Sequence, residues 1–439
     1  MRIGLLGAGT VGSSLLALLV QHEDDLRKRL GEPLEVAAVV VRDGARPRRL
    51  SMPAGAVLTT DAGRVVDDPE VEIVVEAMGG LEPARTYALR ALGRGADWVS
   101  ANKALVAGAG PELFRAAAAS GADLRFEAAV GAAVPVVGTL QDALGAARVL
   151  AIAGVLNGST NFILARMAAG DDAAAAIERA RALGYLEADA ADDLDGYDAA
   201  RKIAILASLA GGRHLAPEGV AVRGVGGLTG DDLQMAAALG CEVKLLAVAE
   251  RAEDGFAAWV APALVPATSP LAAVRGAANA VLIASIPGGE TLVAGQGAGG
   301  APTASALAGD LLAAARRRRA GGRGPTFAWR EAPASPPAPP PRRHVMRVVT
   351  AGAKPPDLAA VPGVRGVAAQ GEGWTAVATE AMDDARVAEV RRRLRAVAGV
   401  REVGVALTRW RAERAEGEEW WRPPVGEAWA AAAREGALA

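Results

Sequence analysis

The glycine-rich segment GAGTVG at residues 7–12 limits the fold of this chain more than any other feature. It follows the apolar run IGLL and precedes an apolar helical pattern, which is the G-x-G-x-x-G context of a dinucleotide-binding βαβ unit. Gly7 and Gly9 would let the main chain turn tightly and approach a pyrophosphate, and Gly12 would let the helix pack on the sheet. N–H groups at the helix start would bind phosphate. A glycine turn without a ligand is the alternative.

The segments after this loop favour a parallel sheet. Helical patterns, the first of them at 13–30, alternate with strand-like runs. Such alternation is typical of βαβ units. The sequence therefore predicts an α/β fold with a Rossmann-type dinucleotide-binding domain. Its strands are expected at 2–7, 34–41, 71–77, 97–101 and 123–130.

The end of the second expected strand bears on the choice of cofactor. An acidic residue there would bind the ribose hydroxyls of NAD, whereas an arginine can bind the 2′-phosphate of NADP. Arg42 comes first and Asp43 next, so the sequence favours NADP and leaves NAD open.

Length and composition exclude several classes of protein. With 439 residues, 51% of them hydrophobic and 22% charged, two or three folded domains are expected. A net charge of −2 predicts neither nucleic acid nor an anionic membrane as a partner. The single cysteine, Cys241, excludes internal disulfides and indicates a cytoplasmic protein. No secretory signal, long apolar span or zinc-type histidine cluster is found.

Changes of composition suggest how the chain divides. Long helical and then strand-like stretches follow the first domain, and a basic run at 316–324 is expected to end a helix. A proline-rich spacer at 333–343 precedes a compact αβ module. The expected parts are a Rossmann domain at 1–134 completed by about 300–320, an α+β substrate-binding and dimerisation domain at 135–300, a linker at 321–343, an α+β module at 344–410 and a tail at 411–439.

The stretch GYLEADAADDLDGYDAARK at 184–202 crowds six carboxylates within twelve residues and ends on a lysine. A calcium loop is excluded, because aligning Gly196 with the loop glycine places Lys202 where the bidentate glutamate belongs. A helix beginning near Gly196 would put Asp198 and Lys202 on one face. This pair is either an ordinary salt bridge worth ~0.2–0.5 kcal/mol or part of a site that holds a cationic substrate.

Two further motifs favour such a site. Lys103 in SANKALVA follows the carboxyl end of an expected strand, the edge where ligands bind in open parallel sheets. The alternative is a surface lysine at a helix start. Small polar residues in LNGSTNFIL, at 156–164, suit the polar ends of a substrate, and a lysine beside carboxylates can transfer a proton.

These motifs, with FEAAVGAAVPVV and GAGGAPTAS, occur in the same order in homoserine dehydrogenases, and the chain resembles that family over roughly residues 1–320. The resemblance implies NADPH- or NADH-dependent reduction of aspartate 4-semialdehyde to homoserine, in the pathway to threonine, methionine and isoleucine. The enzyme would act on a small-molecule substrate as a homodimer or higher homo-oligomer.

The same resemblance assigns roles to residues. Lys202 would donate a proton to the carbonyl oxygen, and Lys103 would lie beside that oxygen or the cofactor. The substrate would contact Glu187, Asp198, Asp193, Gly158 and Ser159. The cofactor would contact Gly7, Gly9, Thr10, Val11, Gly12, Arg42, Lys103, Gly184 and Gly299.

The resemblance also implies a monovalent cation, usually sodium, held by Glu127 and by the main-chain carbonyls of Val130, Ala132 and Val134. The family commonly has glycine where this chain has Ala132 and Ala133. The module after the spacer is similar to an ACT domain, although AGAKPPDL replaces the usual turn and DLAAV the first helix. It would bind threonine, support dimerisation, or bind no ligand.

Two other functions stay open. A related dehydrogenase would reduce another small amino-acid carbonyl. A catalytically silent sensor would only bind a nucleotide and an amino acid, and loss of Lys202, Lys103 or Asp198 would have favoured it; all three are present.

Overall fold

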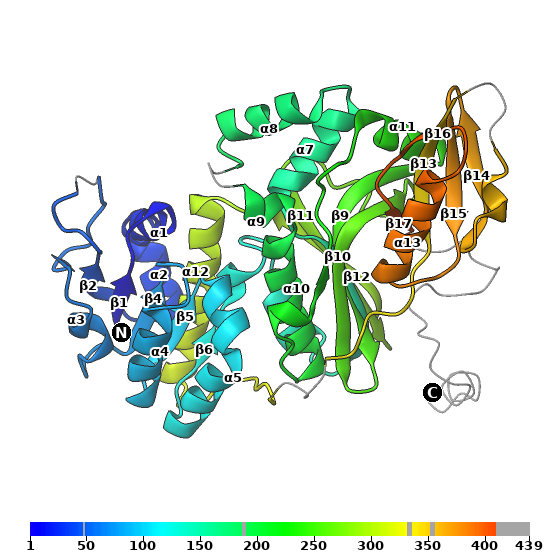
Figure 1. The fold of residues 1–439 in the computed structure, drawn as a ribbon. Helices are drawn as coiled ribbons and strands as arrows, with labels where there is room; N and C mark the ends of the chain where they lie inside the picture. Colours follow the sequence, from blue (N-terminus) through cyan, green and yellow to red (C-terminus); the bar gives the residue numbers. More distant parts are fainter. Residues whose placement is uncertain (47–48, 187–189, 332–335, 352–355, 410–439) are drawn as a thin grey trace.

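The computed structural model describes residues 1–46, 49–186, 190–331, 336–351 and 356–409 (Figure 1). Glu187 and the tail at 411–439 lie outside the described residues. No helix in these ranges combines the length and apolar character needed to cross a membrane.

The N-terminal part is a parallel six-stranded sheet in the order β3-β2-β1-β4-β5-β6, as the alternating pattern predicts. Its strands are β1 (Arg2–Leu6), β2 (Glu35–Val40), β3 (Val57–Thr59), β4 (Ile73–Glu76), β5 (Asp97–Ser100) and β6 (Leu124–Arg125). The helices are α1 (Thr10–Gln21), α2 (Glu23–Leu30), α3 (Gly63–Val66), α4 (Ala84–Gly93) and α5 (Lys103–Ser120). The predicted α/β class with a Rossmann-type sheet is confirmed.

Two local predictions in this domain were wrong, and one strand was missed. The strand expected at 123–130 ends at Arg125, because the chain turns into η1 (Glu127–Ala129) and the Glu127 N–H donates to Asp310 rather than to a neighbouring strand. The helix expected at 13–30 breaks at His22, and α2 begins there with three acidic residues in its first turn, which favours a new helix N-terminus. β3 was missed because none of its three residues is buried, so it has no hydrophobic period.

The helix α12 (Gly300–Arg319) returns to this domain after a long excursion of the chain. Its Leu307 and Leu311 share a buried cluster with Leu15 and Leu16 of α1. The basic run ends this helix as expected, with four arginines in its last turn. Cations there interact favourably with the carbonyl end of the helix.

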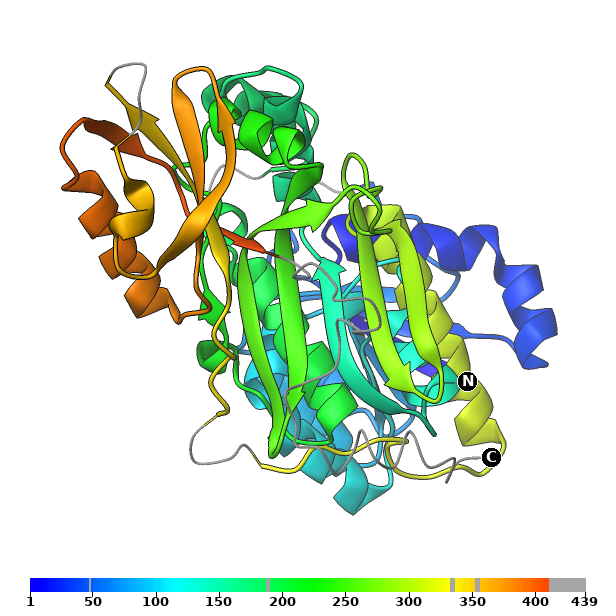
Figure 2. The ribbon, with the colours of Figure 1, turned by 90° about the vertical axis from the view of Figure 1, so that its right-hand side faces the viewer.

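The second sheet is mixed and has the order β12-β11-β7-β9-β10-β17-β13-β15-β14, with β16 beside β13 and β8 beside β10. Figure 2 looks onto its strands. The strands before the spacer are β7 (Arg148–Val155), β8 (Ala221–Val222), β9 (Cys241–Ala252), β10 (Gly255–Pro266), β11 (Ala278–Ile286) and β12 (Gly289–Gln296). The helical elements are α6 (Val136–Gly138), η2 (Thr139–Ala143), α7 (Gly158–Ala168), α8 (Ala173–Ala182), α9 (Ala191–Leu194), α10 (Tyr197–Gly211), η3 (Pro217–Gly219) and α11 (Gly230–Ala238).

The C-terminal module extends this sheet through β17, which pairs with β10 on one side and β13 on the other. Its elements are β13 (His344–Thr350), η4 (Leu358–Ala360), β14 (Val364–Gly371), β15 (Trp374–Thr379), α13 (Asp384–Arg395), β16 (Val400–Val403) and β17 (Leu407–Arg409). Between β13 and β14 the described helical structure is the short turn η4, in place of the first helix of a βαββαβ unit.

Candidate active site

The helix α10 begins where the acidic stretch predicts. Gly196 precedes it with φ 89°, and a Cβ on Gly196 would press against Val260 and Val222. A left-handed residue in a tight contact therefore fixes the helix start. Asp198 lies in the first turn and Lys202 one turn later, and both are buried.

Three charged side chains, Lys103, Asp198 and Lys202, meet at this helix start and are called the catalytic cluster below. Lys202 Nζ lies 2.8 Å from Asp198 Oδ2, and Lys103 Nζ lies 2.9 Å from Asp198 Oδ1. Lys202 also donates to the carbonyl of Leu156 at 2.8 Å. Lys103 begins α5 at the carboxyl end of β5, so the cluster lies where α5 and α10 pack together (Figure 1).

Asn157 joins the cluster to the acidic stretch. It caps α7, with its Oδ1 accepting from the Thr160 N–H, while its Nδ2 donates to Asp193 at 2.6 Å and to Asp198 at 3.0 Å. The sequence interpretation chose the neighbours Gly158 and Ser159 and missed Asn157. An asparagine between a strand and a helix is an N-cap signature that marks such a residue.

Charge and burial set the protonation of the two aspartates. Burial raises the pKa of Asp198, but Lys202, Lys103 and the hydrogen bonds from Lys202 and Asn157 outweigh burial and bring that pKa below its usual range. Burial and the charge of Asp198 raise the pKa of Asp193, against the Asn157 hydrogen bond. Asp198 is thus ionised and offsets one of the two ammonium charges.

A buried carboxylate that the sequence interpretation missed supports Lys103. Glu76, at the end of β4, accepts from the hydroxyl of Ser100 at 2.6 Å, from the N–H of Met78 at 2.7 Å and from Asn102 at 3.4 Å. Asn102 caps α5 directly before Lys103. Burial raises the pKa of Glu76 despite these hydrogen bonds. Glu76 therefore joins the ends of β4 and β5 and binds Asn102, the residue before Lys103.

The glycine loop has the shape that a pyrophosphate needs. Gly7 has φ 97° and a Cβ there would lie 2.6 Å from the Ala77 carbonyl, while a Cβ on Gly12 would collide with the Gly7 carbonyl. Nothing lies within 4 Å of the Cβ position of Gly9, so its exposed main chain is open to a ligand. Thr10 and Val11 form the first turn of α1, and no side chain caps that end. These residues fit a dinucleotide.

Three other residues, Gly299, Gly184 and Ser159, were assigned to the cofactor or the substrate, and they lie in two parts of the structure. Gly299 precedes α12, whose first residue Gly300 packs against Thr10 of the glycine loop. Gly184 follows α8, and its neighbour Tyr185 accepts through its carbonyl from the Ser159 hydroxyl. Gly299 is therefore near the glycine loop, and Gly184 is near the start of α7.

Arg42 follows β2 by two residues, and its side chain is exposed at the carboxyl edge of the parallel sheet. Gly158 is buried at the start of α7, and a Cβ there would collide with the Ala277 carbonyl. This close approach explains the glycine independently of any substrate.

The residues assigned to a cation form the turn from η1 to α6. The two carboxylate oxygens of Glu127 accept from the N–H groups of Val137 at 2.8 Å and Gly138 at 2.7 Å, and burial raises the pKa of Glu127. Val130, Ala132 and Val134 are buried close by in sequence, and Ala132 has φ 49°. One carboxylate with main-chain carbonyls is an oxygen set suited to a hard cation.

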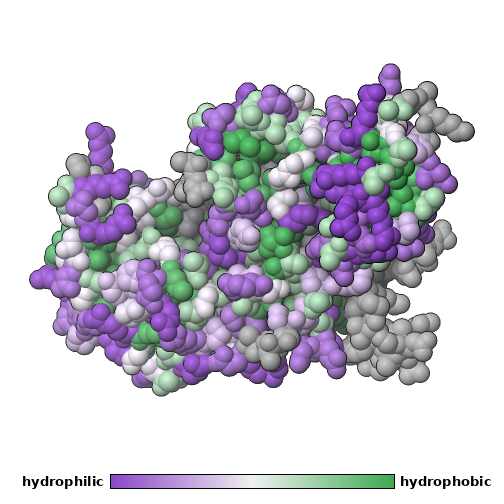
Figure 3. Space-filling model, in the orientation of Figure 1, coloured by the Kyte–Doolittle hydropathy of each residue, from purple (hydrophilic) through white to green (hydrophobic). Residues whose placement is uncertain are grey.

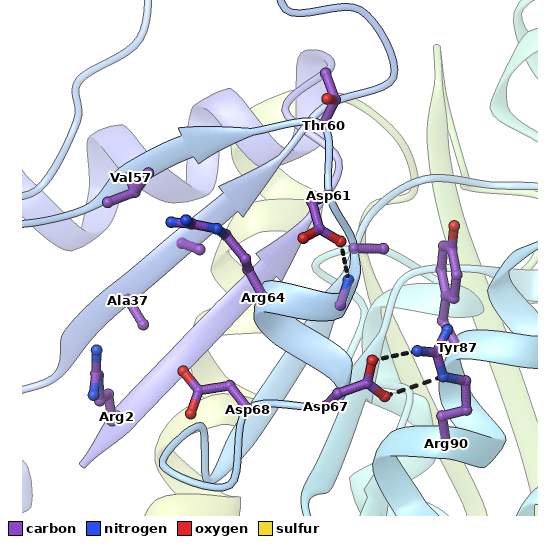
Figure 4. A pocket seen from close by; sticks show the side chains of 13 residues that line it. Arg2, Ala37, Val57, Thr60, Asp61, Arg64, Asp67, Asp68, Tyr87 and Arg90 are labelled. Carbon is purple, nitrogen blue, oxygen red and sulfur yellow. Dashed lines mark hydrogen bonds and ion pairs between the residues drawn. The ribbon is translucent and has the colours of Figure 1, made fainter.

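A cavity of about 900 Å³ lies elsewhere in the N-terminal domain (Figure 4). It is lined by residues of β1, β2, β3, α3 and α4 and of the loops beside α3, and it shares none with the glycine loop or the catalytic cluster. Charges of both signs line it, and two of them, Asp67 and Arg90, pair with each other. This balance of charge indicates no particular ligand.

Comparison with known proteins identifies the family of this chain. Residues 7–127 match the family described as "Homoserine dehydrogenase, NAD binding domain" and residues 135–312 the one described as "Homoserine dehydrogenase". A homoserine dehydrogenase of Mycobacterium tuberculosis is 45% identical over 329 residues, 74% of each chain.

Solved structures extend the likeness. The crystal structure of a homoserine dehydrogenase from Thiobacillus denitrificans has a TM-score of 0.84 and 34% identity, covering 93% of this chain and 98% of the other. A hyperthermophilic archaeal homoserine dehydrogenase mutant in complex with NADPH has a TM-score of 0.61 and 28% identity, covering 72% and 98%. The chain belongs to the homoserine dehydrogenase family of NAD(P)-dependent oxidoreductases in amino-acid biosynthesis.

Proposed function

We propose that this chain reduces L-aspartate 4-semialdehyde to L-homoserine with Lys202 as the proton donor. The observation that supports this role is the pairing of two ammonium groups with one buried aspartate beside the dinucleotide-binding domain. Only 11% of the Lys202 side chain is exposed, against 37% for Lys103. Lys202 is thus fixed for a directed proton transfer, and Lys103 can reach a ligand.

The chemistry needs one hydride and one proton. A bound NAD(P)H supplies the hydride to the aldehyde carbon. The oxygen then develops negative charge, which the ammonium groups of Lys103 and Lys202 stabilise in a site shielded from water. Lys202 transfers a proton to that oxygen and completes the hydroxyl of homoserine. Asp198 stays ionised throughout and holds both lysines.

The acidic stretch would orient the substrate. The α-ammonium group needs carboxylates, and we assign Asp193 and Asp198 to it together with Glu187, which lies outside the described residues. The raised pKa of Asp193 reflects burial and the nearby charge of Asp198, and a substrate ammonium would relieve that repulsion. Gly158 and Ser159 at the start of α7 would contact the polar ends of the substrate.

We propose NADP as the preferred cofactor, with NAD as a possible one. The support is Arg42, exposed at the ligand edge of the sheet, and the NADPH complex of the archaeal relative. Gly7, Gly9, Gly12, Thr10 and Val11 would hold the pyrophosphate. Gly299 and Gly184 would line the same cofactor.

The Arg42→Ala variant tests this preference. A charge-assisted hydrogen bond to phosphate is worth ~1.5–3 kcal/mol, so KM for NADPH should rise about tenfold or more while KM for NADH changes little. Steady-state kinetics with both cofactors give the two values. Equal effects on both would rule out a 2′-phosphate contact.

We further propose a monovalent cation, probed as sodium, at Glu127 and the carbonyls of Val130, Ala132 and Val134. A left-handed alanine is unfavourable by roughly 1 kcal/mol, so Ala132→Gly should raise the free energy of unfolding by about that amount. The free energy of unfolding of wild type and variant is measured in sodium chloride and in choline chloride. The difference between the proteins gives the strain at Ala132, and the difference between the salts gives the dependence on sodium. A decrease in stability would show that Ala132 is not strained.

The assembly and its regulation complete the proposal. We assign a homodimer, supported by β12, an exposed edge strand of the mixed sheet whose main-chain groups can pair with another chain. The C-terminal module would be ACT-like and would bind threonine or support the dimer. The single free cysteine supports action in the reducing cytoplasm.

Oxidation of homoserine by the purified chain tests the function. Absorbance of the reduced cofactor is followed with NADP and with NAD, each with and without threonine. Turnover with homoserine and not with other small hydroxy amino acids is expected. No turnover in folded protein would favour the silent sensor, and turnover only with another substrate would favour a related dehydrogenase.

A further inference from the structure

The seam between the mixed sheet and the C-terminal module contains a second group of basic side chains, two of them partly buried and one completely buried. Arg223 follows β8, Arg342 precedes β13, and His344 is the first residue of β13. The side chain of Arg342 is 10% exposed, and His344 is completely buried. These three residues are called the seam cluster below.

Few acceptors face the seam cluster. Asp384, the first residue of α13, receives Arg342 Nη2 at 2.8 Å and lies 3.7 Å from Arg223 Nη1. The hydroxyl of Thr408 accepts from Arg223 Nη2 at 2.7 Å and lies 3.4 Å from His344 Nδ1. Two guanidinium groups therefore contact one carboxylate, while a second, Glu250 of β9, interacts with Arg342 through its charge and has a pKa raised by burial.

Four nitrogen atoms of the cluster remain without a partner. Within the described residues, Arg223 Nε, Arg342 Nε and Nη1, and His344 Nε2 are buried with no partner in close hydrogen-bond geometry, and the Met382 main chain interacts weakly with the His344 ring. The Arg342 guanidinium lies over the ring of Trp259, 4.9 Å from its centroid, which leaves its edge for a planar acceptor. Buried donors in folded proteins are nearly always paired, so the seam cluster needs an acceptor.

The surroundings make that acceptor an anion. Burial and the charges of Arg223 and Arg342 lower the pKa of His344 to about 3, as expected beside excess positive charge. The N-terminus of α13 adds a partial positive charge at Asp384. Figure 3 shows hydrophilic side chains gathered over α13, and that helix carries five arginines. Water molecules would accept hydrogen bonds from these N–H groups but would not neutralise the positive charge of the arginines.

We propose that Arg223, Arg342 and His344 form a binding site for a small oxyanion, either a free inorganic anion or the carboxylate of a small metabolite. Both present oxygen atoms to guanidinium edges, the geometry in which arginine binds most strongly. The site is separate from the catalytic cluster and does not depend on the reaction proposed above.

The main chain connects this site to the catalytic cluster. The Arg223 N–H donates to Val260, and two residues later the Val225 N–H donates to Leu194 at 2.8 Å. A Cβ on the intervening Gly224 would collide with Leu194, so the two segments are in close contact. Leu194 ends α9, which carries Asp193. The two sites are therefore linked through the main chain and share no side chain.

Thermal unfolding of the full chain in sodium sulfate tests the site without requiring turnover. The reference has the same sodium concentration, with ionic strength matched by choline chloride. Sulfate bound to the folded state should raise Tm with the logarithm of its concentration. Arg342→Gln and Arg223→Gln should need at least about tenfold more sulfate for the same rise, whereas the exposed Arg365→Gln in β14 should behave as wild type.

The controls separate the possible occupants. Sulfate also stabilises proteins generally through exclusion from the surface, so an equal rise in all four proteins would overturn the proposal. Sodium acetate and glycine form the carboxylate arm, and a response to either with none to sulfate assigns the site to a carboxylate. If Arg342→Gln does not fold, Arg342→Lys takes its place, because lysine keeps the positive charge but not the paired N–H donors of the guanidinium group. An unchanged sulfate response in Arg342→Lys would also overturn the proposal.

Discussion

The catalytic cluster and the seam cluster are built alike, since each places two cations on one aspartate at the start of a helix. Lys103 and Lys202 share Asp198 in α10, and Arg223 and Arg342 share Asp384 in α13. They differ in where the surplus positive charge lies. In the catalytic cluster it belongs to Lys103, which is partly exposed and is screened by water until a ligand arrives.

In the seam cluster the hydrogen-bond donors without a partner are buried away from solvent. Arg342 Nη1 and His344 Nε2 are buried without a partner among the described residues. An unpaired buried donor costs ~1–3 kcal/mol. The comparison teaches that an open cluster can await its ligand at little cost, whereas a closed one carries the cost of its unpaired donors until an occupant binds.

The largest expected effect concerns the catalytic cluster. Lys202→Ala removes the proposed proton donor, and kcat for homoserine oxidation should fall roughly 10²-fold or more, the usual scale for a positioned acid or base. NADPH binding, measured by titration, should survive because Lys202 is not among the residues assigned to the cofactor. Lys28→Ala in the exposed part of α2 is the matched control. Near-normal turnover would remove Lys202 from the mechanism.

The same substitution in both clusters tests their likeness. Asp198→Asn should lower kcat/KM for homoserine by about tenfold to a hundredfold, because hydrogen bonds to charged groups are worth ~1.5–3 kcal/mol. Asp384→Asn should leave kcat unchanged, lower Tm in chloride, and increase the stabilisation by sulfate, because it removes the carboxylate that both arginines of the seam cluster contact. Steady-state kinetics and thermal unfolding of both variants measure these effects. Loss of activity in Asp384→Asn would contradict the separation of the two clusters.

Local patterns predicted part of the catalytic cluster. The i, i+4 spacing of Asp198 and Lys202 and a helix start near Gly196 follow from adjacent residues, and both are observed. The contact of Lys103 with Asp198 joins residues almost a hundred positions apart, so it depends on how two domains pack. Spacing alone could not predict it, and the expectation that they share a site came from the family resemblance.

The remaining residues escaped prediction for physical reasons. Asn157 and Asn102 act as helix caps and as hydrogen-bond donors to carboxylates, and only the first role leaves a sequence signal. Arg223 and the pair Arg342 and His344 come from two segments far apart in the sequence, which the pairing of β17 with β10 and β13 brings together. From the sequence, a basic side chain between a proline-rich spacer and a strand is expected to be exposed to solvent. Its burial depends on tertiary packing, which the local sequence does not show.

The smallest expected effect is a difference between the two clusters in how each makes stability depend on pH. His344 has a pKa of about 3 in the folded chain against about 6.5 when unfolded, so the unfolded state binds the extra proton between these values. Neutral His344 therefore contributes its full stabilisation of the fold above about pH 6.5. Below that pH the free energy of unfolding falls by ~1.4 kcal/mol per pH unit, which amounts to ~2 kcal/mol by pH 5. The lowered pKa of Asp198 matters only below its ordinary range, so the catalytic cluster should not respond there.

Urea unfolding of wild type and His344→Gln at pH 7, 6 and 5, in chloride without sulfate, measures the difference. Every other titrating group, including Asp310 with its pKa raised to about 7 by burial and by Glu127, is common to both proteins and cancels in the comparison. The wild type should lose ~2 kcal/mol more than the variant between pH 7 and 5. Parallel pH dependences would mean that His344 is protonated in the fold, so that the seam cluster already holds an anion or opens to water.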